Sequence, residues 1–230
     1  MIKTGFSKID EKIGGFPEGS SVLILGEPKV GKTIFSLNLA FNHLASGGGC
    51  ISLTTDDLAG NKFEVAKKFG WRFADFQKIR IIDAYLPTHG KVEYGNDLRK
   101  IVTVAEGGIK NLVDMFFFFT KISQQMKEDS VKIIKVFDSL SPLILHHKFN
   151  DVLDLVKKLV NKNFEFKDLF IFIVEGGIHE NKVYETLKFL NDYIIEIEKR
   201  VEGKFMKIYG KDIPELTFEY KINENGISIE

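Results

Sequence analysis

Residues 21–46 read SVLILGEPKVGKTIFSLNLAFNHLAS, and this stretch decides the predicted fold. An apolar, β-branched run from Val22 to Leu25 leads into a glycine-containing loop, and apolar residues at helical spacing follow from Ile34 to Leu44. This order predicts a buried strand, a loop and an amphipathic helix. The loop, residues 26–33, has the spacing GxxxxGKT. Its glycines let consecutive N–H groups point at phosphate oxygens, and the helix start adds the positive end of its dipole.

The loop therefore predicts a phosphate-binding site. We expect Lys32 to lie against the β- and γ-phosphates of a nucleotide and the Thr33 hydroxyl to bind Mg²⁺. The complete predicted set of cofactor-binding residues is Gly26, Glu27, Pro28, Lys29, Val30, Gly31, Lys32, Thr33 and Ile34.

Composition limits the class of protein. At 230 residues the chain is long enough for one sizeable α/β domain, and we expect a single domain over residues 1–230. The formal net charge is zero, which counts against nucleic-acid binding. Cys50 is the sole cysteine, so no intramolecular disulfide can form. The sequence shows neither a signal-peptide core nor an apolar run of about 18 residues, so we expect a soluble, cytoplasmic protein without a membrane span.

Alternating strand and helix patterns continue along the chain and predict an α/β fold, with a mostly parallel sheet flanked by helices. After about residue 191, short strands joined by tight turns predict antiparallel strands at one edge of the sheet. Predicted strands cover residues 22–25, 50–55, 79–83, 131–138, 169–174, 193–198, 204–209, 216–222 and 227–229. Predicted helices cover residues 6–13, 34–44, 56–69, 109–127, 150–160 and 181–191, the fifth capped by Asn150 and Asp151.

Two segments leave alternatives open. Residues 84–108 contain a proline and four glycines and predict a long excursion with at most a short helix. Within the next helix, Phe116–Phe119 are four consecutive aromatic residues. Because such a run covers more than one face of a helix, some of these rings must enter the core or meet a partner.

Asp138 is the candidate acid on the metal side of the site. It ends an apolar-biased predicted strand, and an aspartate at the carboxyl end of a parallel strand can orient water on a metal ion beside Thr33. We therefore expect Asp138 to hold Mg²⁺ through water. The alternative for this position is a helix N-cap or loop acid.

Several stretches together resemble the KaiC-like branch of the RecA-type ATPases. They are TGFSKIDEKIGGFPEGSSVLILG (residues 4–26), GEPKVGKT (26–33), SLTTDD and AKKFGW (52–57 and 66–71), KVFDSLSPLIL (135–145) and GKDIPELTFEYKINENGISI (210–229). The resemblance covers most of the chain and is weakest over about 84–130. It implies a RecA-like P-loop NTPase fold, ATP with Mg²⁺, and side-by-side assembly of homo-oligomers, commonly hexameric rings.

The sequence departs from the family pattern at the position of the catalytic base. Active relatives place two adjacent glutamates at the end of the second strand, where Thr54 and Thr55 stand here. A threonine hydroxyl does not take a proton at neutral pH. Asp56 or Asp57 replaces the glutamate only if the strand continues two residues further; otherwise they are acids at the start of the next helix. Glu175 follows an apolar strand and is a further candidate, as a γ-phosphate sensor, a stand-in base or a structural residue.

A second departure lies near the carboxyl terminus. Active ring members carry a Lys-x-Arg pair that reaches the γ-phosphate of the neighbouring subunit. Here Lys207 keeps the lysine, whereas Tyr209 replaces the arginine and cannot supply its positive fork. Lys211 is either a substitute for that charge or a solvated residue at a strand end.

The sequence therefore favours a protein that binds ATP and Mg²⁺ and hydrolyses ATP slowly or not at all. Such a protein would act as a nucleotide-dependent switch or scaffold, and we expect it to bind a protein partner. The first alternative is an active ring ATPase with Asp56, Asp57 or Glu175 as base and Lys207 acting in trans. The second is a RecA-like DNA-repair factor, against which the zero net charge counts.

Overall fold

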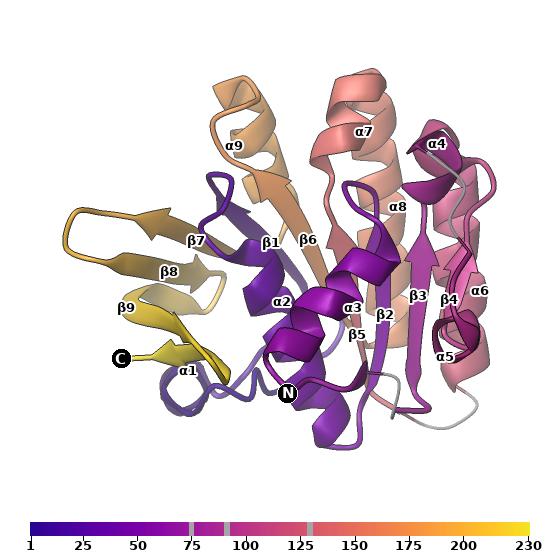
Figure 1. Cartoon of the computed structure of the whole chain (residues 1–230). Coiled ribbons are helices and arrows are strands. Elements are labelled where there is room, and N and C mark those ends of the chain that lie inside the picture. Colours follow the sequence, from indigo (N-terminus) through magenta and orange to yellow (C-terminus); the bar gives the residue numbers. More distant parts are fainter. Residues whose placement is uncertain (74–75, 90–92, 128–130) are drawn as a thin grey trace.

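A ten-stranded sheet forms the centre of the molecule, with strand order β10-β9-β8-β7-β1-β6-β5-β2-β3-β4 (Figure 1). The computed structural model describes residues 1–73, 76–89, 93–127 and 131–230. The strands are β1 (Ser21–Gly26), β2 (Gly49–Thr54), β3 (Ile79–Asp83), β4 (Val102–Val104), β5 (Ile133–Asp138), β6 (Leu169–Glu175), β7 (Tyr193–Lys199), β8 (Lys204–Gly210), β9 (Ile213–Asn223) and β10 (Gly226–Ile229).

The strands from β7 to β4 run parallel, and β8, β9 and β10 continue the sheet as antiparallel strands. The mostly parallel sheet with antiparallel carboxyl-terminal strands is therefore confirmed. One detail was wrong: β7 was expected among the antiparallel strands, but it pairs in parallel with β1. Because α9 crosses over between β6 and β7, the chain returns to the same end of the sheet before β7 starts.

Helices cover both faces of the sheet. In Figure 1, α2 and α3 lie in front of the strands, α6 and α8 lie behind them, and α1 lies below the lower end of the sheet. The helices are α1 (Ser7–Ile13), α2 (Lys32–Ala45), α3 (Ala59–Lys68), α4 (Leu86–His89), α5 (Asn96–Arg99), α6 (Leu112–Lys127), α7 (Ser141–His146), α8 (Phe149–Phe166) and α9 (Asn181–Leu190), with the 3-10 helix η2 (Gly108–Lys110) before α6.

The alternation of side chains along β1 builds a core on each face. Val22 and Ile24 pack with Phe35 and Leu39 of α2 on one face, whereas Leu23 joins the cluster beneath α6 and α8 on the other. Successive residues of a strand point to opposite faces, so a strand that is covered on both sides must be apolar throughout. This requirement explains the continuous apolar run that precedes the loop.

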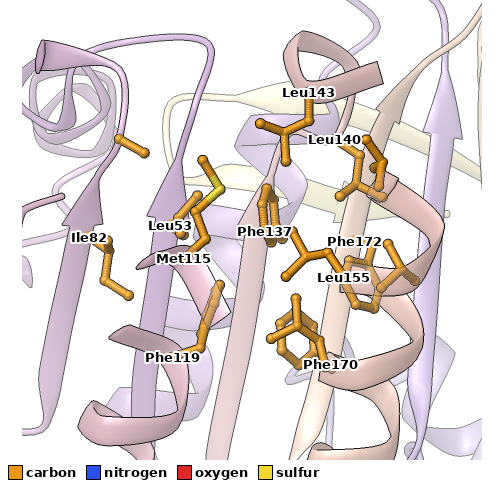
Figure 2. Packing of buried hydrophobic residues seen from close by; sticks show 14 of the residues in the cluster. Leu53, Ile82, Met115, Phe119, Phe137, Leu140, Leu143, Leu155, Phe170 and Phe172 are labelled. Atoms are coloured by element: carbon orange, nitrogen blue, oxygen red, sulfur yellow. The ribbon is translucent and has the colours of Figure 1, made fainter. Parts of the chain in front are cut away.

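Helix geometry places the four residues Phe116–Phe119 in different environments. Phe119 is 1% exposed and its ring lies 5.8 Å from that of Phe137 and 5.0 Å from that of Phe170 (Figure 2). Phe116 and Phe118 pack partly buried against the same core, and Phe117 is 55% exposed. Phe119 thus takes the core position that α6 directs at the sheet, Phe116 and Phe118 border the core, and Phe117 lies at the surface.

Three local predictions differ from the structure. Residues 84–108 hold two short helices, α4 and α5, and an edge strand, β4, which was not predicted. A three-residue strand is too short to show a period of two in the sequence. Helix α8 begins at Phe149 after Lys148, so Asn150 and Asp151 lie in its first turn and do not cap it.

The remaining predicted strands and helices are confirmed to within a few residues of their ends. None of the helices in the described part of the chain is long and apolar enough to cross a membrane.

Candidate functional site

The loop between β1 and α2 has the backbone of an anion-binding turn. Gly31 has φ 111° and Lys29 has φ 66°, and the left-handed backbone at these positions curls the loop around the start of α2. Gly31 is the N-cap residue, and within the described residues no side chain caps this helix. The first N–H groups of α2 are therefore available to an anion, which the helix dipole favours.

Lys32 extends back under the loop and is 4% exposed. Its Nζ donates to the carbonyl oxygens of Gly26 at 2.9 Å and Glu27 at 2.7 Å. It also forms an ion pair of 2.8 Å with Oε2 of Glu175, at the end of the neighbouring strand β6. The loop lysine is thus held against the loop backbone and against one carboxylate from another strand.

The loop is held in place from three sides. The N–H of Gly176, directly after β6, donates to the oxygen of Gly26 at 2.6 Å. A Cβ on Gly26 would lie 2.3 Å from the oxygen of Ile197 on β7, so a side chain is sterically excluded there. From β9, the Tyr220 hydroxyl donates to the carbonyl of Val30, and burial raises the pKa of Tyr220 to about 12. The carboxyl-terminal strands therefore help to shape the loop.

Asp138 lies where β5 ends, directly opposite Thr54 on β2, and is 2% exposed. Its Oδ2 accepts a hydrogen bond from Nζ of Lys62, which comes from α3. Its Oδ1 is buried without a hydrogen-bond partner among the described residues. A buried carboxylate oxygen in this situation fits a further donor, such as water on a metal ion. Thr33, the other predicted metal ligand, is half-buried in the first turn of α2.

Asp56 belongs to the same group of charges. Its Oδ1 lies 3.0 Å from Nζ of Lys62, so one ammonium joins Asp56 to Asp138. Partial burial of the Asp56 carboxylate and the neighbouring charge of Asp138 raise the pKa of Asp56 to about 6. Burial opposes the charge on Lys62, but the two carboxylates outweigh it and raise its pKa.

Asp57 and the two threonines have local roles. Oδ1 of Asp57 accepts from the N–H of Leu58 and from Nδ2 of Asn61, both at 2.7 Å. Helix α3 begins at Ala59, so Asp56 and Asp57 precede this helix and do not lie in its first turn. Thr54 and Thr55 are buried, and their hydroxyls donate to the carbonyls of Asp57 and Ser139.

Glu175 connects the loop lysine to the start of α9. The backbone N–H of Glu175 donates to Oγ of Ser141 at 2.9 Å, and that oxygen lies 3.0 Å from Nε2 of His179. The Tyr184 hydroxyl donates to the carbonyl of Glu175 at 3.0 Å and accepts from the N–H groups of residues 178 and 179. These contacts hold the backbone of Glu175 at the start of the turn between β6 and α9, while its carboxylate pairs with Lys32.

A family model of the KaiC ATPases matches residues 2–230 of this chain. The chain belongs to the KaiC family of ATPases. Membership of this KaiC family supports nucleotide binding in general, and a nucleotide in such ATPases usually binds with Mg²⁺.

Curated relatives match part of the chain. A UPF0273 protein of Thermotoga maritima is 30% identical over 148 residues, which are 63% of this chain and 57% of that protein. A UPF0273 protein of Methanopyrus kandleri is 26% identical over 148 residues, 63% of this chain and 55% of that protein. The chain thus matches little more than half the length of these curated relatives.

The crystal structure of a KaiC-like protein from Pyrococcus horikoshii superposes with a TM-score of 0.73 at 19% identity, covering 100% of this chain and 98% of that one. This similarity shows that the two chains share the RecA-like fold of KaiC proteins.

The two KaiC-type positions near the carboxyl terminus have partners within the same chain. Lys207 lies on β8 with Nζ 3.5 Å from Oε1 of Glu215. The Tyr209 hydroxyl donates to Oε1 of Glu196 at 3.0 Å, and Lys188 pairs with the same carboxylate at 2.7 Å. This environment raises the pKa of Tyr209 to about 12, mainly by burial and then by the Glu196 charge. Lys211 is exposed after the end of β8.

Two residues of this KaiC-like site were missed in the sequence. Lys62 lies on the buried side of α3 among Ala59, Phe63 and Ala66, and a lysine inside an apolar stripe was the available signal. Tyr220 alternates with Phe218 and Ile222 along β9, which identifies a buried face, but nothing local indicates that this face meets the loop.

Proposed function

We propose that this chain binds ATP through residues 26–34 and acts as a nucleotide-dependent switch or scaffold that hydrolyses ATP slowly or not at all. The observation that carries this proposal is the ion pair between Lys32 and Glu175. The β- and γ-phosphates of ATP would compete with Glu175 for the Lys32 ammonium. The Glu175 carboxylate, which is 24% exposed at the end of β6, would then be free to take another partner, so nucleotide binding would change the charge presented beside the loop.

Mg²⁺ would be held by the Thr33 hydroxyl and, through water, by Asp138, and when bound it would screen the phosphate charge. The buried Oδ1 of Asp138 is consistent with this role. Phosphate contacts would come from the loop N–H groups and from Lys32.

Slow hydrolysis is supported by the partners of the candidate bases. Glu175 is paired with Lys32, Asp56 with Lys62, and Asp57 accepts from Leu58 and Asn61. A carboxylate oxygen that already accepts from an ammonium or from N–H donors must give up such a contact before it can orient an attacking water.

The raised pKa of Asp56, about 6, supports the alternative of an active ATPase with Asp56 as base, because a catalytic base works best with a pKa near the working pH.

We also propose that the protein is cytoplasmic, consists of one domain, assembles into ring-shaped homo-oligomers and binds a protein partner. In such an assembly Lys207 would exchange its partly exposed partner Glu215, at 3.5 Å, for a nucleotide on the neighbouring subunit.

Lys32→Ala tests the nucleotide site. With ATP at about one hundred times its Kd, binding stabilises the folded state by about 2.7 kcal/mol. For a domain of this size, we expect the melting temperature of the parent to rise by about 5–10 °C. Lys32→Ala should lose this shift, whereas Lys182→Ala, which removes an exposed lysine on α9, should keep it. If ATP raises the melting temperatures of the parent and of Lys32→Ala equally, the proposed site is contradicted.

ATP hydrolysis tests the alternative. Steady turnover of ATP near one per second that is lost in Asp56→Asn would favour the active ATPase.

A further inference from the structure

Tyr220 on β9 is a buried tyrosine whose hydroxyl contacts the backbone of the loop between β1 and α2. The side chain is 1% exposed, and its hydroxyl donates to the carbonyl oxygen of Val30. The backbone of Tyr220 is fixed on both sides, because it pairs with Lys204 on β8 and with Ile229 on β10. The hydroxyl is therefore presented to the loop from the middle strand of three.

The Val30 carbonyl belongs to the same peptide group as the N–H of Gly31. This peptide bond is trans, and in a planar trans peptide the C=O and the N–H point in opposite directions. Because Tyr220 holds the carbonyl towards β9, the N–H of Gly31 points away from β9. Within the described part of the chain this N–H donates to no acceptor. It is thus an available donor directly before α2, where the helix dipole favours an anion.

The loop sequence alone does not fix the orientation of this peptide group. Glycine adopts φ of either sign at little cost, so the peptide between Val30 and Gly31 could turn over without strain at Gly31. In the reversed orientation the carbonyl oxygen would face a bound phosphate and repel it. Ile222 also packs here, since a Cβ added to Gly31 would lie 2.9 Å from Cδ1 of Ile222. Strand β9 therefore contacts both residues that share this peptide group.

We propose that Tyr220 is a positioning residue of the ATP site, whose hydroxyl holds the Val30 carbonyl outward so that the Gly31 N–H is directed at a bound phosphate. This inference rests on the proposed function, because it concerns the same site. Tyr220 acts through the loop backbone and not on the nucleotide itself. Its effect therefore extends to any diphosphate or triphosphate group, whatever base or sugar is attached.

Calorimetric titration of ATP and of inorganic pyrophosphate, both with MgCl₂, into the full chain tests this role. Tyr220→Phe keeps the ring and removes the hydroxyl, so the peptide group after Val30 is free to turn over. The Kd for each ligand should rise by about tenfold, as expected when a hydrogen bond to a charged group is lost. Replacement of Tyr220 by 4-aminophenylalanine keeps an N–H donor at this place and should return both Kd values to within about threefold of the parent's.

Tyr193→Phe is the matched control. Tyr193 lies on β7 of the same sheet, is 2% exposed, and has its hydroxyl 3.5 Å from Oδ2 of Asp212. This variant also removes a hydroxyl from a buried tyrosine, but one that is directed at Asp212 and not at the loop. Its Kd values should stay within about twofold of the parent's, even if urea denaturation shows that both variants lose stability.

The amide resonance of Gly31 gives a second readout, which a merely structural role of Tyr220 would not change. In the ¹⁵N-labelled parent, saturating pyrophosphate should shift the Gly31 amide proton downfield, because this N–H gains a charged acceptor. The same addition to Tyr220→Phe should give a smaller shift.

The outcomes separate the two levels of the argument. Equal Kd values in the parent and Tyr220→Phe overturn the role of Tyr220 and leave the proposed function intact. An equal loss of affinity in Tyr193→Phe, or no recovery with 4-aminophenylalanine, overturns it too. A Gly31 amide that does not respond to pyrophosphate in the parent has the same consequence and decides the question even if Tyr220→Phe does not fold. A parent that binds neither ATP nor pyrophosphate refutes the proposed function and this inference together.

Discussion

Glu175→Gln is the perturbation that most directly tests how the loop lysine is controlled. In the structure, Nζ of Lys32 lies 2.8 Å from Oε2 of Glu175, with side-chain exposures of 4% and 24%. Glutamine has nearly the same shape as glutamate, and its amide oxygen can still accept from Lys32. The substitution therefore removes the charge of the acceptor and little else. Because phosphate must compete with this acceptor, we expect ATP to bind more tightly.

The size of the effect follows from the charge that is lost. Lys32 is an ammonium in both proteins, so only the charge of the acceptor changes. For this pair, with one buried and one partly exposed partner, that charge is worth slightly more than the roughly 0.2–1 kcal/mol of fully exposed ion pairs. The carbonyls of Gly26 and Glu27 contact Lys32 in both proteins and cancel from the comparison. A charge contribution of about 1–1.5 kcal/mol corresponds to ATP affinity about five to thirteen times higher in Glu175→Gln.

Isothermal titration calorimetry of ATP into the two proteins measures this ratio. Glu180→Gln is the matched control, since Glu180 is an exposed carboxylate in the same turn, directly before α9. It changes the net charge equally without touching Lys32, so its affinity should stay near that of the parent. An unchanged or weaker affinity in Glu175→Gln would refute the competition between Glu175 and phosphate, and an equal gain in Glu180→Gln would assign the effect to general charge.

Two further predictions concern stability. Phe119→Ala should lower the free energy of unfolding by about 3–5 kcal/mol, because the ring is buried between Phe137 and Phe170, whereas Phe117→Ala, at an exposed position, should change it by less than about 0.5 kcal/mol. Urea denaturation measures both, and equal losses would contradict the division of the run. Because the pKa of Asp56 rises from 3.8 to about 6 on folding, the folded state holds the proton more tightly than the unfolded chain. The stability contributed by protonated Asp56 is therefore lost as pH rises from about 4 to about 6, and Asp56→Asn should flatten the urea midpoints over this range. A profile parallel to that of the parent would argue against the raised pKa.

Much of the fold could be predicted because its signals are local. Continuous apolar runs identified β1, β5 and β6, and the short alternating segments after residue 191 identified the antiparallel strands. The missed elements were short: β4 has three residues and α7 has six. Elements of this length are stabilised by their neighbours, and their own sequence shows no period.

The candidate site could be predicted in part. The loop and Asp138 follow directly from spacing and from position at the end of a strand, and their geometry is compatible with the predicted roles. The partners of these residues could not be derived in the same way. Asp56 and Asp57 were considered as a pair, whereas the structure separates them: Asp56 faces Lys62, and Asp57 binds the start of α3.

The sequence by itself determined the order of strand, loop and helix around residues 21–46, the alternation of strands and helices, and the residues offered to a phosphate. These features depend on side chains a few positions apart, whose periodicity and backbone preferences act locally. The tertiary structure alone decided which charges meet. Lys62 and Asp138 are 76 positions apart, Lys32 and Glu175 are 143 apart, and Tyr220 and Val30 are 190 apart. These contacts arise from the order in which strands assemble into the sheet, and that order depends on the packing of the whole chain.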